Sequence, residues 1–240
     1  MKKPKVFFLA ANTGRSQIYA QAMLEFGLLP ERTLIFGQNP KKTLKWENTE
    51  NSSLNLEGFS PNMDEQIADT LEKGNAKVEY IKAANVNDVE ICKKIVAADP
   101  DLVIYSGYGG QILKSEILTL GTQFLHLHAG LLPNYKGSTT VYYSWLQEKR
   151  CSVSAILLDH NIDTGPIIAT ETYPPPEKGV DVDIVYDNCL RANLMVKVLD
   201  SYCKKGNFTT KKNDSTSGKT YYVIHPLLKH IALLSQENFL

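Results

Sequence analysis

Two histidines stand two residues apart in an apolar stretch, and this spacing could support acid–base or metal chemistry. The stretch reads Phe124-Leu125-His126-Leu127-His128 and is followed directly by turn-forming residues. In a strand, residues i and i+2 point to the same face, so both imidazoles would project from one side of a sheet. Ligands of open α/β sheets usually bind beyond the carboxyl ends of the strands, which is where His128 would lie.

Carboxylates and a third histidine follow another apolar run, at 153–158, in the segment Asp159-His160-Asn161-Ile162-Asp163. Titratable groups gathered at strand ends are typical of an active site, and this disfavours reading the histidine pair as two inert core residues. Two reaction classes fit. In acyl or formyl transfer, a neutral imidazole and a carboxylate handle protons while donors hold the developing oxyanion. In a metal hydrolase, zinc would be ligated by His126, His128, His160 and Asp163.

The elements that must position these groups alternate between strand and helix patterns. Apolar, β-branched and aromatic runs predict strands at 6–10, 33–36, 78–81, 102–105, 124–128, 153–158 and 166–172. Helical patterns predict helices at 16–26, 63–73, 86–98, 138–148 and 181–202. Strand, helix and strand in this order build right-handed crossovers. We therefore expect an α/β, Rossmann-like fold with a largely parallel twisted sheet and helices on both faces.

Composition limits the class of protein. The 240 residues include 26 basic and 26 acidic side chains, so the formal net charge is zero, and 43% are hydrophobic. These values are typical of a soluble globular chain, and the lack of a basic excess disfavours nucleic acid as a partner. The four cysteines have no C-x-x-C spacing, so we expect reduced thiols and a cytoplasmic location. No apolar run approaches the ~18 residues of a membrane span.

Two segments interrupt the alternation. Residues 38–62 are polar and predict a long loop or lid. Residues 204–220 contain five lysines and one aspartate. For this second segment we expect a solvated loop, with a cationic flap that closes over a phosphorylated ligand as the alternative.

Three separated blocks, in order, resemble the formyltransferase family. They are Ser106-Gly107-Tyr108-Gly109-Gly110-Gln111-Ile112-Leu113, then residues 126–137, then Ile162-Asp163-Thr164-Gly165-Pro166-Ile167-Ile168. The family pattern reads approximately Asn-x-His-x-Ser-Leu-Leu-Pro-x-x-Arg-Gly followed by Asp-x-Gly-x-Ile. Its members include methionyl-tRNA, glycinamide-ribonucleotide and nucleotide-sugar N-formyltransferases. The resemblance implies transfer of a formyl group from N10-formyltetrahydrofolate to an amine.

Carried over residue by residue, the resemblance implies three catalytic residues and no metal ion. The family histidine falls on His128 and the family aspartate on Asp163, whereas His126 replaces the family asparagine. In the family, the asparagine and histidine interact with the formyl oxygen, and the aspartate supports proton transfer and orients the histidine. His126 could still donate one N–H to that oxygen. The replacement leaves two alternatives open: a folate-independent hydrolase, with or without a metal, and a ligand-binding pseudoenzyme.

The resemblance also implies a folate site between two segments, with the pterin in an apolar slot held mainly by backbone groups. The bordering residues would be Tyr108, Gly110, Gln111, Ile112, Leu113, Leu158, Asp159 and Ile162.

The amine acceptor is expected at the first strand-to-helix turn and at the turn before helix 138–148. Gly14 permits the first turn, Ser16 and Ser138 are expected N-caps, and Arg15 could receive a phosphate at the positive helix end. A nucleotide base could stack on Trp46, Phe59 or Tyr19. The residues expected to bind the acceptor are Asn12, Gly14, Arg15, Ser16, Lys136, Ser138 and Thr139.

The distribution of elements predicts a catalytic domain at 1–173 and, at 174–240, a helix, a basic loop and a closing strand and helix. The second part is too short for a separate oligonucleotide-binding barrel, which disfavours a tRNA acceptor. We therefore expect a small phosphorylated or nucleotide-linked amine, foremost a nucleotide-linked amino sugar, and no nucleic-acid or membrane partner. A homodimer is compatible with the sequence.

Overall fold

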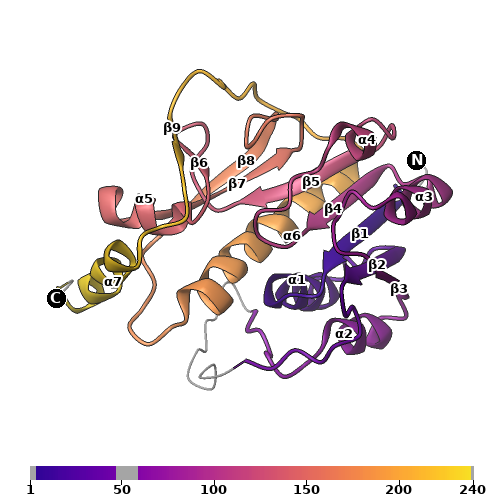
Figure 1. The fold of residues 1–240 in the computed structure, drawn as a ribbon, viewed down its shortest axis with the longest axis horizontal. Helices are drawn as coiled ribbons and strands as arrows, with labels where there is room; N and C mark the ends of the chain where they lie inside the picture. Colours follow the sequence, from indigo (N-terminus) through magenta and orange to yellow (C-terminus); the bar gives the residue numbers. More distant parts are fainter. Residues whose placement is uncertain (1–3, 47–58, 239–240) are drawn as a thin grey trace.

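A twisted sheet with strand order β3-β2-β1-β4-β5-β7-β8 forms the centre of the molecule (Figure 1). The computed structural model describes residues 4–46 and 59–238. Strands β1 to β5 run parallel, and β7 and β8 continue the sheet in antiparallel pairing. The expected Rossmann-like fold with a largely parallel sheet is therefore confirmed. The strands are β1 (Val6–Ala11), β2 (Arg32–Gly37), β3 (Lys77–Lys82), β4 (Leu102–Ser106), β5 (Gln123–His128), β7 (Cys151–Leu157) and β8 (Ile167–Tyr173).

Helices cover both faces of this sheet. Phe8 of β1 packs into a core with α1, α5 and α6, whereas its neighbour Phe7 packs into a core with α3 and α4. The first core contains residues from both sides of position 173. No helix in the described ranges is long and apolar enough to cross a bilayer. The helices are α1 (Gly14–Glu25), α2 (Ile67–Lys73), α3 (Val89–Ala98), α4 (Ser115–Leu118), α5 (Thr140–Glu148), a π-helical turn (Val182–Tyr186), α6 (Asp187–Lys205), α7 (Pro226–Leu234) and a 3₁₀ turn (Ser235–Asn238).

Two expected N-caps are wrong. Helix α1 starts earlier than predicted because Thr13 has an extended backbone and its hydroxyl accepts the N–H of Ser16 at 3.3 Å. The Ser16 hydroxyl instead lies 2.8 Å from that of Ser106, across the sheet edge. At α5 the cap is Thr139, in the left-handed region with φ of 50°. The Ser138 N–H donates to the carbonyl of Tyr221 at 2.9 Å instead of starting the helix.

Residues 206–224, called here the C-terminal strap, run from the end of α6 past β8 to α7 (Figure 1). Lys211 pairs with Ile167 of β8 through two backbone hydrogen bonds of 2.9 and 2.7 Å. Strand β9 (Lys219–Tyr221) then pairs in parallel with β6 (Tyr135–Gly137). The expected solvated loop fits most of the strap, whose lysines are exposed, but the strap is also anchored to the body, and its Asn213 is buried.

The described part of the polar segment after β2 has the loop character that the sequence predicts. Residues 38–46 form no helix or strand. The remainder of that segment up to residue 58 lies outside the described residues.

Candidate active site

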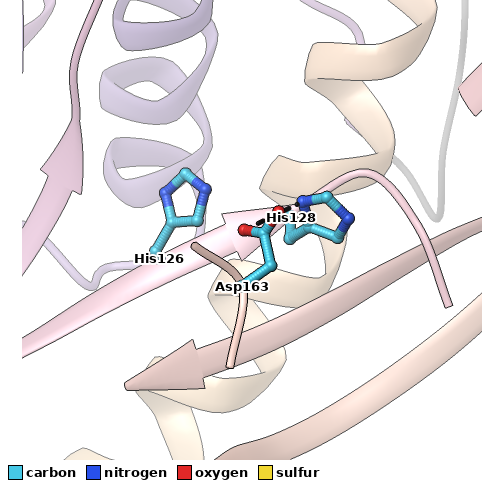
Figure 2. A group of neighbouring side chains, drawn as sticks. All are labelled: His126, His128 and Asp163. Carbon is cyan, nitrogen blue, oxygen red and sulfur yellow. Dashed lines mark ion pairs between the residues drawn. The ribbon is translucent and has the colours of Figure 1, made fainter. Parts of the chain in front are cut away.

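His126, His128 and Asp163 meet beyond the carboxyl end of β5 (Figure 2). Both histidines belong to β5, and Asp163 lies in the loop between β7 and β8. One potential ligand atom from each residue lies within 4.8 Å of the others. The shortest recorded contact joins His128 Nδ1 to Asp163 Oδ1 at 3.4 Å. The structure therefore brings together the three residues that the sequence singles out as catalytic.

The protonation state of His128 follows from its partners. Its Nε2 lies 2.6 Å from the carbonyl oxygen of Tyr135, which can only accept, so Nε2 carries a proton. Burial lowers the pKa of His128, against the opposing effects of Asp163 and of that carbonyl. The neutral imidazole therefore holds its free lone pair on Nδ1, beside the Asp163 carboxylate. A proton that arrives at Nδ1 is stabilised by this carboxylate.

Asp163 is held in an unusual backbone conformation. Its φ is 55°, in the left-handed region that costs a non-glycine residue free energy. Carboxylate oxygen Oδ2 accepts the N–H of Gly137 at 2.7 Å. The Asn213 amide donates to the backbone oxygens of Asp163 at 2.9 Å and Gly165 at 3.1 Å. The side chain is thus aimed at His128 by groups from β6 and from the C-terminal strap.

His126 is a neutral imidazole in this site. Its pKa lies well below the ordinary value, because the half-buried ring loses solvation and because Arg191, Arg15 and His128 oppose a further positive charge, against a hydrogen bond with the backbone of Tyr105. Its Nδ1 is buried without a hydrogen-bond partner among the described residues. A neutral ring carries one N–H and can donate it to an oxyanion. The geometry therefore permits His126 to do what a carboxamide does at this position.

Two guanidinium groups, those of Arg191 and Arg15, lie close enough to the histidines to influence their charge. Arg191 Nη1 donates to the carbonyl of Leu127, between the two histidines, at 2.6 Å. Its Nε and Nη2 bind one carboxylate oxygen of Asp187 at 3.0 and 2.9 Å. The Arg15 guanidinium donates to the carbonyl of Gly107, and burial together with Arg191 lowers its pKa. Arg15 is therefore turned into the protein, which gives no support to the phosphate contact expected of it.

The two segments expected to border the folate lie side by side. Ser115 Oγ, just beyond the first segment, is 3.3 Å from Nδ1 of His160 in the second. Ile112 and Ile162 expose 52% and 50% of their surfaces, one from each segment. Exposed apolar side chains on adjoining loops suit a flat, partly apolar ligand.

The other residues of these two segments shape the loops. The Tyr108 hydroxyl donates to the carbonyl of Phe36 at 3.4 Å, and the Gln111 amide donates to that of Ala84 at 2.9 Å. The Asp159 carboxylate accepts the Thr164 hydroxyl at 2.8 Å. Gly110 has φ of 79°, whereas Leu113 and Leu158 pack into the core.

The residues expected to bind the acceptor make different kinds of contact within the protein. The Asn12 amide donates to the carbonyl of Lys42 at 2.8 Å and lines a surface cavity. The Lys136 ammonium is buried and donates to the carbonyls of Ser215 and Ser217 at 2.9 and 2.8 Å, so it holds the strap instead of facing a ligand. Thr139 accepts the N–H of Ile224 at 2.8 Å.

Other side chains near the first turn are also engaged. A Cβ on Gly14 would lie 3.0 Å from the Trp46 ring, so glycine is needed for close approach. Trp46 donates to Gln17 at 2.9 Å, and Tyr19 and Phe59 are buried. Stacking of a base on Tyr19 or Phe59 is therefore wrong.

In the alternative four-ligand zinc site, His160 does not take its place. This exposed residue contacts Ser115, and the cluster found among the described residues contains only two histidines and one aspartate. The nearby guanidiniums of Arg15 and Arg191 oppose the entry of a cation. Three protein ligands nevertheless match the minimum of a catalytic metal site.

Several residues of the site could not be identified from the sequence. Thr140 Oγ1 lies 3.5 Å from His128 Nε2, and the carbonyl of Tyr135 accepts the proton of that nitrogen. Neither has a chemical signature in the sequence. The pairing of Arg191 with Asp187 could have been predicted from the sequence. The two charged side chains are four residues apart and interrupt the core-facing pattern of a long helix. The remaining residue, Asn213, looked like an ordinary loop polar residue.

Comparison with known proteins places this geometry among relatives. A sequence model of a family described as "Formyl transferase" matches residues 40–193, which include His126, His128 and Asp163. The methionyl-tRNA formyltransferase of Finegoldia magna is 28% identical over 170 residues, which cover 69% of this chain and 53% of that protein. The chain thus spans about half the length of this curated relative.

Solved structures show the same fold at low identity. A sugar N-formyltransferase from a Shewanella species has a TM-score of 0.58 and 16% identity, with 96% of this chain and 87% of that chain covered. HypX from Aquifex aeolicus, solved in complex with tetrahydrofolic acid, has a TM-score of 0.56 and 12% identity, with coverage of 95% and 31% respectively.

Proposed function

The chain belongs to the formyl transferase family, and from this membership we propose that it is an N-formyltransferase acting on a small amine. The formyl donor would be N10-formyltetrahydrofolate, and the leading acceptor is a nucleotide-linked amino sugar. The observation that carries the proposal is the contact between His128 Nδ1 and Asp163 at 3.4 Å, inside the region matched by the family.

The donor would lie against the loops that bear Ile112 and Ile162, whose exposed side chains suit its pterin. Bound there, N10-formyltetrahydrofolate supplies an activated formyl carbon. His126 would donate its single N–H to the formyl oxygen as negative charge develops there. The donor of that hydrogen bond is preorganised because the ring is held on a strand.

His128 would handle the proton of the acceptor. An amine that attacks a carbonyl carbon becomes positively charged and must lose a proton. His128 Nδ1 can take it, because Nε2 is already protonated and donates to Tyr135. The resulting imidazolium is stabilised by Asp163 beside it. The same proton can then be returned to the leaving nitrogen, so the products are a formamide and tetrahydrofolate.

The choice of a sugar acceptor over tRNA is supported by the sequence and by the neighbours. The formal net charge is zero, which does not favour a polyanion. A structural neighbour is named as a sugar N-formyltransferase and covers nearly the whole chain. The curated relative named above acts on methionyl-tRNA according to its name, and tRNA is therefore the competing acceptor.

The proposal is tested by incubating the protein with N10-formyltetrahydrofolate and a panel of nucleotide-linked amino sugars, with mass spectrometry to detect a gain of one formyl group. His128→Ala and Asp163→Ala should each lower turnover by about 10²–10⁴-fold, because each removes proton handling. His230→Ala, an exposed histidine of α7, is the matched control and should behave as wild type. Full turnover by His128→Ala would overturn the mechanism. Tight folate binding without turnover of any amine would instead indicate a ligand-binding pseudoenzyme.

A second candidate function rests on the cluster of His126, His128 and Asp163. Replacement of the family asparagine by histidine produces two imidazoles and one carboxylate within 4.8 Å, a set able to bind zinc. A metal-dependent hydrolase of formylated compounds would then be expected. Elemental analysis decides: stoichiometric zinc in the purified protein, lost in His126→Ala, supports this candidate, and metal-independent formyl transfer eliminates it.

A further inference from the structure

Two adjoining cavities lie apart from the catalytic cluster, at the carboxyl ends of β1, β2 and β3. The first has a volume of about 450 Å³ and is lined by Asn12 after β1 and Tyr108 after β4. The second has a volume of about 590 Å³ and is lined by Tyr80 and Lys82 of β3. Gln38, Asn39 and Lys42 line both, so the two cavities adjoin, and they are together called the depression here. Each volume falls in the range of sites for small molecules.

The charged side chains that line this depression are lysines, whereas the carboxylates of Glu72 and Asp69 on α2 act on Tyr80 from outside the lining. The lining includes Lys41, Lys42 and Lys82, and no acidic residue belongs to the described lining. Within ranges 4–46 and 59–238, neither Lys42 nor Lys82 has a carboxylate at ion-pair distance. Uncompensated ammonium groups in a hollow attract phosphate groups. A protein with zero net charge thus has a local group of lysines within one hollow.

Aromatic and amide groups accompany the lysines. Tyr80 exposes 37% of its surface, and the Lys41 ammonium lies 4.9 Å from the centre of its ring. Gln38 and Asn39 are exposed and offer amide donors and acceptors. A phenol ring can stack on a nucleobase, and amides can bond its edge. Phosphate-binding cations, a ring and amides within one hollow match the three parts of a nucleotide.

The position of the depression relative to His128 fits an extended ligand. Adjacent strands are about 4.8 Å apart, so the ends of β1, β2 and β3 lie two, three and four strand intervals from β5, or roughly 10, 14 and 19 Å. An amine bound directly in the depression would be too far from His128 to react. A sugar attached through a diphosphate extends beyond its base by two phosphates and a ring. Its amine can therefore reach the catalytic cluster while its nucleotide stays in the depression.

We propose that this depression binds the nucleoside diphosphate part of the acceptor, with the phosphates at Lys42 and Lys82 and the base toward Tyr80. The inference rests on the proposed formyl transfer but assigns residues outside the catalytic cluster. Asn12, at the end nearest β5, would contact the sugar. The first strand-to-helix turn would then contribute through Asn12, and Arg15, whose guanidinium donates to the carbonyl of Gly107, would take no part in holding phosphate.

Binding is measured by isothermal titration calorimetry with uridine diphosphate and thymidine diphosphate as probes. We expect wild type to bind at least one of them, and Lys42→Ala and Lys82→Ala each to weaken binding about tenfold, the effect of one lost charge–phosphate contact. Tyr80→Ala should weaken the binding of a nucleoside diphosphate but not that of inorganic pyrophosphate. Lys204→Ala, an exposed lysine paired with Asp200 on α6, is the matched control.

Three outcomes would overturn the assignment. The first is wild type that binds neither diphosphate. The second is that the lysine variants lose affinity for a triglutamylated tetrahydrofolate but not for the diphosphates. The depression would then bind the glutamate tail of the folate. The third is tight binding of tRNA without binding of either diphosphate.

The assignment and the proposed function fail separately. His128→Ala should bind the diphosphates as wild type does but lose turnover. Lys42→Ala should raise KM for a nucleotide-linked amino sugar about tenfold at unchanged kcat. Unaltered diphosphate binding in the lysine variants would remove this site and leave formyl transfer intact.

Discussion

At the scale of the residue, the histidine at position 126 is the feature that sets this site apart from the family pattern. An imidazole is larger than a carboxamide and can titrate, yet burial and two guanidinium groups keep its pKa well below the ordinary value. It therefore presents one N–H at neutral pH, as an asparagine does. Arg15 and Arg191 also favour an oxyanion beside His126, because their positive charges act at the same place.

Substitution at this position separates hydrogen bonding from shape. His126→Asn restores a donor, and we expect it to keep formyl transfer within about tenfold of wild type. His126→Leu fills similar space without a donor and should lower kcat by about 10²–10³-fold, the usual cost of one oxyanion donor. Steady-state kinetics with the formylated product measured by mass spectrometry give both values. Equal activity of the two variants would remove His126 from the reaction.

At the scale of the element, the C-terminal strap completes a site that is otherwise built on the sheet. Its Asn213 amide holds two carbonyls of the loop that carries Asp163. Asp163 has a left-handed backbone, so a loop released from these bonds would relax and withdraw the carboxylate from His128. A strap that crosses the edge of the sheet thereby acts on chemistry at the end of β5.

Replacing Asn213 tests this connection. Asn213→Ala leaves two buried carbonyls unpaired, which should cost about 1–3 kcal/mol of unfolding free energy. It should also lower kcat more than it raises KM, because Asp163 is misplaced whereas the binding loops are not. Lys212→Ala, an exposed neighbour in the strap, serves as the control for both chemical denaturation and kinetics. A stability loss with unchanged kcat would show that the strap is structural only.

The pairing of β6 with β9 depends on one glycine. Gly137 has φ of 98°, and a Cβ there would lie 2.1 Å from the carbonyl oxygen of Tyr221. Its N–H also donates to Asp163. We expect Gly137→Ala to destabilise the fold by about 2–4 kcal/mol, because backbone strain and a steric clash add, and to reduce turnover.

Gly206→Ala is the matched comparison for this variant. Gly206 has φ of 76° and open space at its Cβ position, so only the conformational term of about 1 kcal/mol should appear. Equal losses in thermal unfolding for the two variants would contradict the role assigned to the β6–β9 pairing.

At the scale of the whole molecule, two neutral histidines, one buried and one half-buried, make stability depend on pH. Both His126 and His128 have a lowered pKa in the folded state, whereas in the unfolded chain each titrates near 6.5. Below this pH the unfolded state therefore binds protons that the folded state does not, and folding stability falls as pH falls. The stability is fully present above about pH 6.5.

Urea denaturation between pH 7 and pH 5.5 measures this effect in a range where carboxylates stay charged. Wild type should lose up to about 1 kcal/mol of unfolding free energy per pH unit for each of these two histidines. His126→Asn should show roughly half of that slope. A slope that is the same in both proteins would mean that His126 is protonated in the folded state.

The local pattern of the sequence predicted the strand and helix order, the parallel sheet and the histidine pair on one face. They follow from hydrophobic patterns that repeat every two residues in strands and every 3.6 in helices, and such patterns depend only on residues close together in the chain. Helix starts were less certain, because Thr13 and Ser16 are both good caps and only the backbone conformation of Thr13 decides between them. The resemblance carried by three separated blocks identified the candidate catalytic residues.

Other features depended on contacts between residues far apart in the chain. Asn213 meets Asp163 across 50 residues, and Arg191 meets the carbonyl of Leu127 across 64. The lysines of the proposed nucleotide depression come from two segments that parallel pairing of β2 with β3 brings together. The sequence by itself determined which groups could do chemistry, because side-chain type and spacing are local. Tertiary structure decided which groups are buried, paired or free to bind, because burial and charge balance depend on every element that packs around them.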